Sequence, residues 1–106
     1  MNSKVILAYC TFPDENTAHT ICEQLVDEST IACANVLGPM RSFYKWNGKL
    51  HKEQEWIAIF KTSVFKRATL KERIRATHPY ENPCLVFLAI EDGLPDFLKW
   101  VYTQSL

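Results

Sequence analysis

The side chains best suited to chemistry in this 106-residue sequence are two cysteines and a histidine that lie far apart along the chain. Cys10 closes a predicted N-terminal strand, His78 follows a predicted helix, and Cys84 opens a later predicted strand. Thiolate and imidazole groups are good ligands for copper and zinc. If the two strands are neighbours, the three side chains form a site suited to Cu(I) or Zn(II). Alternatively, the two thiols fill apolar volume on opposite faces of the sheet, and His78 caps a helix C-terminus.

Other reactive side chains point to weaker alternatives. Cys10 and His78 are residues of the kind that form a thiolate–imidazole pair in nucleophilic catalysis. No residue stands out, however, as a donor to the oxyanion. Glu53 and Glu55 are two residues apart on a predicted strand, so they share a face, which we expect solvent to cover. Lys61 ends a buried run and either pairs with a carboxylate, binds an anion or extends to water. The three glycines are too scattered for a phosphate-binding loop. We therefore expect a binding protein and not an enzyme.

The N-terminal elements are a strand and a helix. Residues 5–10 are continuously apolar, which is typical of a central strand covered on both faces. Over about residues 14–29, apolar side chains recur at helical spacing: Ala18, Ile21, Cys22, Leu25 and Val26. This spacing predicts an amphipathic helix with one buried stripe.

A long hairpin is predicted next. Residues 31–46 and 49–62 indicate two strands joined by Asn47-Gly48, which favours a type I′ turn because both of its central residues need positive φ. Gly38-Pro39 predicts a bulge or bend in the first of these strands, at a sheet edge, since proline cannot donate to the ladder. The hairpin carries more aromatic surface than one small domain can cover: Phe43, Tyr44, Trp46 and Trp56. We expect another subunit to bury it.

The second half of the chain repeats the alternation of helix and strand. Ser63 is a predicted N-cap for a helix that ends near Thr77, residues 78–83 form a rigid loop with two prolines, and residues 84–90 form a strand. Asp96 is a predicted cap for a short C-terminal helix. The order βαββαβ with right-handed crossovers predicts one α+β domain over residues 1–106, a ferredoxin-like sandwich with strand order 4-1-3-2.

Composition and charge exclude several classes of protein. Twelve Lys and Arg against twelve Asp and Glu give a net charge of zero, so the chain lacks the excess of positive charge that is typical of a nucleic-acid binder. No apolar run has the length of a transmembrane helix or a signal peptide, so we expect a cytoplasmic protein without a membrane partner. The four cysteines include no CxxC pair, and we expect them to be reduced.

Five segments also occur in the order of a known family. They are CTFPDE at 10–15, IACANV at 31–36, SFYKWNGKL at 42–50, KT at 61–62 and HPYENP at 78–83. In combination they resemble the CutA family of divalent-cation tolerance proteins, over nearly the whole chain from about Val5 to Val101. The resemblance implies a trimer of ferredoxin-like domains that the long hairpins lock together.

The resemblance also implies two kinds of site. The family is associated with copper binding, attributed to the cysteine that matches Cys10 and to histidines at the loop of His78. In this sequence Thr77 stands where some members have a second histidine, and Cys84 stands where the family usually has glutamate. The family is similar in architecture to PII regulatory proteins, which bind small effectors between subunits. That similarity implies a cleft lined here by Tyr44, Lys61, His78 and Tyr80.

Overall fold

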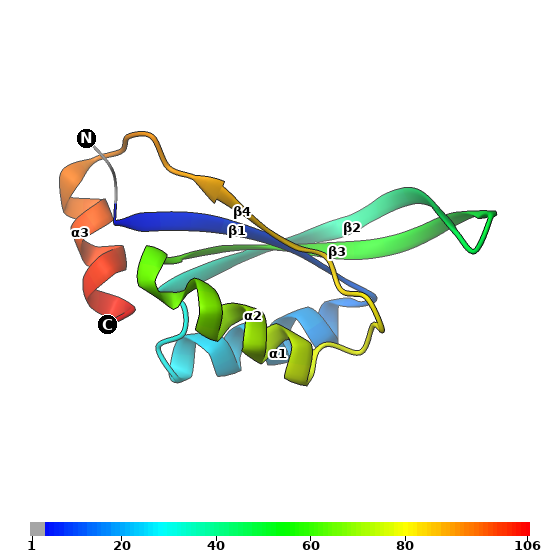
Figure 1. Ribbon diagram of the computed structural model, residues 1–106, viewed down its shortest axis with the longest axis horizontal. Helices are drawn as coiled ribbons and strands as arrows, with labels where there is room; N and C mark the ends of the chain where they lie inside the picture. The colour runs from blue at the N-terminus through cyan, green and yellow to red at the C-terminus, as the bar shows by residue number, and fades with distance from the viewer. Residues whose placement is uncertain (1–3) are drawn as a thin grey trace.

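The computed structural model describes residues 4–106 as one antiparallel sheet with its two longer helices on one face and a shorter helix at one end (Figure 1). The elements follow the predicted order: β1 (Val5–Phe12), α1 (Glu15–Asp27), β2 (Cys33–Trp46), β3 (Lys49–Ser63), a 3₁₀ turn (Val64–Lys66), α2 (Arg67–Thr77), β4 (Leu85–Ala89) and α3 (Pro95–Gln104). The strands lie in the order β2-β3-β1-β4, with β1 antiparallel to both neighbours. The predicted ferredoxin-like fold and strand order are confirmed.

Helix α1 forms as its sequence pattern predicts. The Asp14 carboxylate accepts the backbone N–H of Thr17 at 2.7 Å and satisfies one free donor of the first turn. The buried face consists of Ala18, Ile21, Cys22 and Leu25, which pack on the sheet. Val26, the fifth residue of the predicted stripe, is largely exposed.

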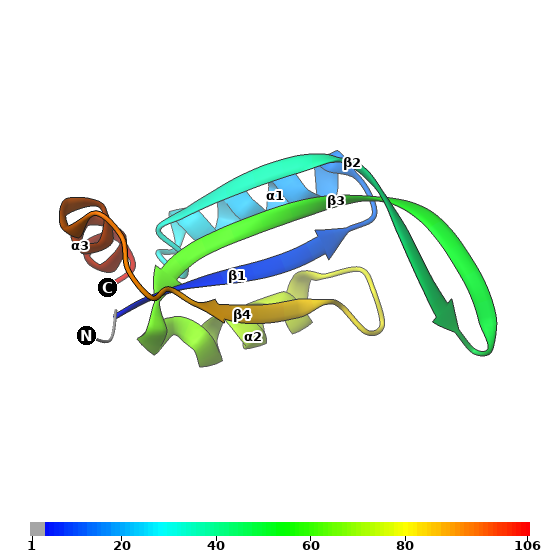
Figure 2. The same ribbon diagram turned by 90° about the horizontal axis from the view of Figure 1, so that it is seen from above.

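The hairpin of β2 and β3 extends well past the other strands. Asn47 and Gly48 both have positive φ, 53° and 77°, as a type I′ turn requires. The register shifts between Leu37 and Met40, where the bulge was predicted. The last pair between β1 and β3 is Phe12 with Trp56, so residues 40–55 have no third strand beside them and project from the body (Figures 1 and 2).

The ends of the later helices differ in detail from the prediction. The Ser63 hydroxyl accepts the N–H of Phe65, but this cap begins the 3₁₀ turn, and α2 starts only at Arg67. The predicted cap of the C-terminal helix was wrong. Leu94 is the N-cap and contributes no side-chain bond, while Asp96 lies inside the first turn. The reason is Pro95, which fits the first helical turn because it has no N–H to satisfy.

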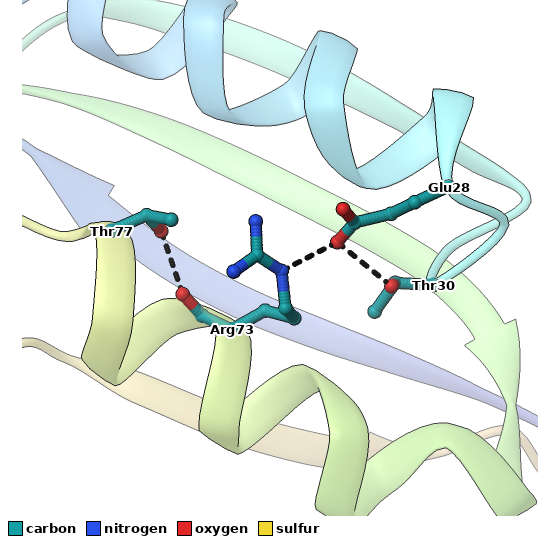
Figure 3. A network of polar contacts seen from close by, with 4 residues as sticks. All are labelled: Glu28, Thr30, Arg73 and Thr77. Carbon is teal, nitrogen blue, oxygen red and sulfur yellow. Dashed lines mark hydrogen bonds and ion pairs between the residues drawn. The ribbon is translucent and has the colours of Figure 1, made fainter.

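A small polar network ties α2 to the segment that follows α1 (Figure 3). Arg73 Nε donates to Glu28 Oε1 at 2.7 Å, and the Thr30 hydroxyl donates to the same oxygen at 3.1 Å. The Thr77 hydroxyl donates to the Arg73 carbonyl at 2.7 Å. The Arg73–Glu28 pair is thus a direct polar link between α2 and the end of α1.

The two faces of the sheet differ in cover. Alternate residues such as Ala8, Cys10 and Phe60 face α1 and α2 and form the main core. The residues between them form a second face, which we call the open sheet face: Leu37, Ile57, Ile59, Tyr9, Val86 and Leu88. Val86 and Leu88 on it are 51% and 48% exposed. An apolar row on an uncovered face is a typical interaction surface.

Helix α3 covers only one end of the sheet, where Val101 packs against Val5 and Ala32. The backbone N–H of Ser63 donates to Ser105 Oγ, which fixes the end of this helix to β3. Within residues 4–106, no helix is long and apolar enough to cross a membrane.

Candidate functional site

Cys10 lies in the middle of the core. Its side chain is fully buried among residues of β1, β3 and both large helices, and its thiol makes one weak contact, at 3.9 Å, with the carbonyl oxygen of Thr11. Burial, reinforced by the nearby Cys84, raises the pKa of Cys10 to about 12. At neutral pH this sulfur is a protonated thiol, which is a poor metal ligand and a poor nucleophile.

His78 is buried at the end of α2, where it begins the rigid loop. It stacks on Phe12, with ring centroids 4.9 Å apart, and contacts Tyr80 at 4.8 Å. Nε2 lies 2.7 Å from the Thr11 carbonyl oxygen, and Nδ1 accepts the backbone N–H of Tyr80 at 3.1 Å. This network assigns the proton to Nε2. Burial lowers the pKa of His78, so the ring is held neutral with both nitrogens engaged.

Cys84 lies near these residues but on a different side of the sheet. Leu85 is paired with Cys10 in the register and packs in the same core. Cys84 precedes Leu85, so it lies on the same side of the sheet as Val86, which is the open sheet face. Its side chain is half-buried, and burial together with the charge of Glu55 raises the pKa of its thiol.

The three predicted metal ligands are thus not brought together in one chain. Among residues 4–106, no group of three His, Cys, Asp or Glu side chains is placed to hold a metal ion. The donors do not fit a resident metal in this arrangement, because one thiol is sealed in the core and both imidazole nitrogens are already bonded. The assignment of Cys10, His78 and Cys84 as ligands stays a prediction for metal titration.

Of the predicted cleft residues, Tyr80 lies against His78 and binds a carboxylate at the base of the hairpin. The Tyr80 hydroxyl donates to Glu55 Oε2 at 2.8 Å, and burial with this carboxylate raises the pKa of Tyr80. Tyr44 stacks on His51 with ring centroids 5.2 Å apart, and its pKa is raised by desolvation and by the charges of Glu53 and Glu55. Tyr80 and Glu55 thus form a hydrogen-bonded pair at the hairpin base, whereas Tyr44 lies nearer the turn, opposite His51.

Glu55 is the residue that sequence reasoning missed. We expected solvent to cover both glutamates of this strand, and Glu53 is indeed exposed. Glu55 is only 7% exposed. The available signal was its place directly before the buried run that starts at Trp56, where β3 leaves the body of the sheet.

Lys61 lies at the other end of β3. Its ammonium group donates to the side-chain oxygen of Asn35 and lies 6.0 Å from the ring centroid of Phe97. Lys61 lies six positions after Glu55, which corresponds to roughly 20 Å along a strand. A cleft that contains Lys61 together with Tyr44 and Tyr80 therefore needs two subunits.

A separate groove of about 420 Å³ lies on α1 next to the end of α2. Its lining carries no ionisable side chain: Asn16, Thr17, Thr20, Ile21, Gln24 and Thr77. This lining offers no general acid, base or strong metal ligand.

Comparisons with known proteins agree on one family. The family model described as CutA1 divalent ion tolerance protein matches residues 6–104. The divalent-cation tolerance protein CutA of Thermotoga maritima is 40% identical over 102 residues, which are 96% of this chain and 100% of that protein. The CutA of Pyrococcus horikoshii is 40% identical over 101 residues, covering 95% and 98% of the two chains.

Solved structures match equally well. The divalent cation tolerance protein of Thermus thermophilus superposes with a TM-score of 0.93 at 35% identity, over 95% of this chain and 98% of that one. CutA1 from Oryza sativa gives a TM-score of 0.95 at 27% identity, over 99% and 96%. The family model and the relatives span almost the whole sequence. The chain therefore belongs to the CutA1 divalent ion tolerance protein family.

Proposed function

We propose that this chain works as a homotrimer that binds a ligand without transforming it and that this binding serves divalent-cation tolerance. Membership of the CutA1 family supports the link to divalent cations. The relatives reported above bear the names of tolerance proteins and of no enzyme, which supports binding over turnover. The observation that carries the assembly is the exposed apolar surface of the sheet and hairpin.

The surface area of the single chain supports an assembled state. The accessible surface is 7059 Å², whereas a compact monomer of this mass exposes about 6,100 Å². The chain measures 44 × 26 × 23 Å, with the hairpin projecting along the long axis (Figure 1). Much of the excess is apolar, since Phe43, Trp46 and Leu50 of the hairpin are all exposed. Burial of this area against other copies supplies the free energy of association.

The shape of the chain favours a ring. The hairpin and the open sheet face are different surfaces, so a contact between them is head-to-tail rather than twofold. Head-to-tail contacts close into rings when the rotation allows it. The family resemblance implies three subunits, and the edge strands β2 and β4 are free to extend the sheet between neighbours.

Cross-linking tests this contact directly. A photoreactive phenylalanine analogue in place of Phe43 should attach to a peptide of β1, β3 or β4 in another copy. The same analogue in place of Phe65, which is exposed on the 3₁₀ turn, is the control and should attach weakly or elsewhere. Attachment from both positions to the same peptides would count against the proposed contact.

Copper is the ion that the resemblance implies, and the donors of a single chain do not fit it. We therefore assign no step to a metal. Equilibrium titration of the purified protein with Cu(I) and Zn(II) tests the remaining possibility that assembly completes a site. Stoichiometric binding that Cys10→Ser or Cys84→Ser abolishes would support metal binding at these residues. Binding unchanged in both variants would remove them as ligands.

The second candidate function is a PII-like regulatory module that binds a small molecule between subunits. The buried Glu55 with its Tyr80 partner favours this function. Sites for small molecules usually contain a few such polar groups, which fix the orientation of the ligand. Lys61 would then come from the neighbouring subunit. The net charge of zero of the chain argues against nucleic acid or an anionic membrane as the partner.

We also propose a cytoplasmic location, which rests on the sequence alone. One solved relative, from Archaeoglobus fulgidus, is described as a periplasmic divalent cation tolerance protein. Fractionation of cells that produce the chain at its natural level distinguishes the two compartments.

A further inference from the structure

Glu55 combines a largely buried side chain with a carboxylate that has a single hydrogen-bond partner. Its side chain belongs to a residue that is 7% exposed, and Oε2 accepts the hydroxyl of Tyr80 at 2.8 Å. In the described residues 4–106, Arg73 forms an ion pair with Glu28, the imidazole of His51 lies 3.7 Å from Glu53, and no basic side chain pairs with Glu55. A carboxylate with so little access to water is stabilised when a cation or further donors bind it.

The second oxygen of this carboxylate remains available to a partner. Among residues 4–106, every side-chain nitrogen or oxygen that is sealed from solvent has a hydrogen-bond partner. Oε1 of Glu55 has no hydrogen bond within this described range, so it is not sealed and reaches the surface of the chain. Glu55 therefore presents one anchored oxygen and one free oxygen at the hairpin base.

The surroundings of the free oxygen select the kind of cation. A bound metal needs several donors, and the described chain offers no group of three. The neighbours are instead the phenol of Tyr80, which donates to Glu55, and the ring of His78, which lies against Tyr80. A carboxylate beside aromatic rings is the usual environment for an ammonium or guanidinium group.

We propose that Glu55 is the recognition point for an ammonium or guanidinium group, which binds to its free oxygen while Tyr80 holds the other. The group has two possible sources of the same chemistry. One is a small amine or guanidine ligand, and the other is a basic side chain of a neighbouring subunit, for which Lys61 is the candidate. Only the second source rests on the proposed assembly.

Titration with a simple cation tests the site. The probe is n-butylammonium chloride, with sodium butyrate as the control of opposite charge, and the readout is the backbone amide resonance of Tyr80. Glu55→Gln keeps the shape and the acceptor for Tyr80 but removes the charge. Glu53→Gln removes the same charge from an exposed position two residues away on the same strand. We expect Glu55→Gln to lower the affinity for n-butylammonium about tenfold or more, and Glu53→Gln to change this affinity little.

The same variants distinguish the two sources. If the assembled wild type does not bind the probe, but Glu55→Gln weakens association and Glu53→Gln does not, a neighbour supplies the cation. Association should then return in the charge-swapped variant Glu55→Lys with Lys61→Glu. A wild type that is monomeric yet binds the probe would overturn the trimer and support the site. If Glu55→Gln and Glu53→Gln have the same affinity for the probe and the same strength of association between subunits, the site itself is overturned.

Discussion

Truncation of Trp46 should weaken assembly about a hundredfold while leaving the monomer folded. Trp46 lies at the hairpin tip and is 43% exposed in the single chain. For a side chain of roughly 250 Å², this is about 110 Å² that a neighbour can cover. At about 25 cal/mol per Å², the lost burial corresponds to about 2.7 kcal/mol per contact, or about a hundredfold in the association constant. Sedimentation velocity over a dilution series measures the change.

The matched control for this prediction is Trp100→Ala. Trp100 is 45% exposed but lies on α3, at the end of the molecule opposite the hairpin (Figure 1). A hairpin-based contact predicts that Trp46→Ala dissociates at much higher concentration than Trp100→Ala. Equal dissociation of the two variants, or a Trp46→Ala variant that assembles like the wild type, would refute the reasoning.

Three further predictions follow from the environment of particular residues. A thiol reagent should modify the half-buried Cys84 in the folded protein while Cys10, with its pKa near 12, reacts only on unfolding, and mass spectrometry of the labelled peptides checks the order. Burial lowers the pKa of His78 from 6.5, so its neutral ring contributes stability that is complete above pH 6.5 and is lost as the pH falls through the lowered pKa. Urea unfolding from about pH 7.5 to about pH 5 should show this loss in the wild type and less of it in His78→Asn. Gly38→Ala should destabilise the protein by about 1–3 kcal/mol, measured by urea unfolding, because an added Cβ would lie 2.5 Å from the Trp56 ring; Gly93→Ala, where the nearest contact is 3.2 Å, is its milder control.

The fold was predictable because its signals are local. The apolar stripe from Ala18 to Leu25 specifies the buried face of α1, and Asn47-Gly48 specifies the hairpin turn, each within a few residues. The start of the C-terminal helix was misplaced for an equally local reason. Asp96 has the right type for a cap, but Pro95 already occupies the first turn.

The site was less predictable because it depends on contacts between distant segments. Alternation placed Glu53 and Glu55 on one face, but only the contact with Tyr80, 25 residues away, decides which of them is buried. The proposed metal cluster depended in the same way on strand register. Pairing of Cys10 with Leu85 places Cys84 one residue out of step, which the sequence alone does not reveal.

Sedimentation equilibrium of the wild-type protein tests the central claim most directly. The proposed trimer predicts a single species with about three times the 12.3 kDa mass of the chain at micromolar concentration. A species of 12.3 kDa over the same range would contradict the account, because the open sheet face and the hairpin would then remain exposed in solution.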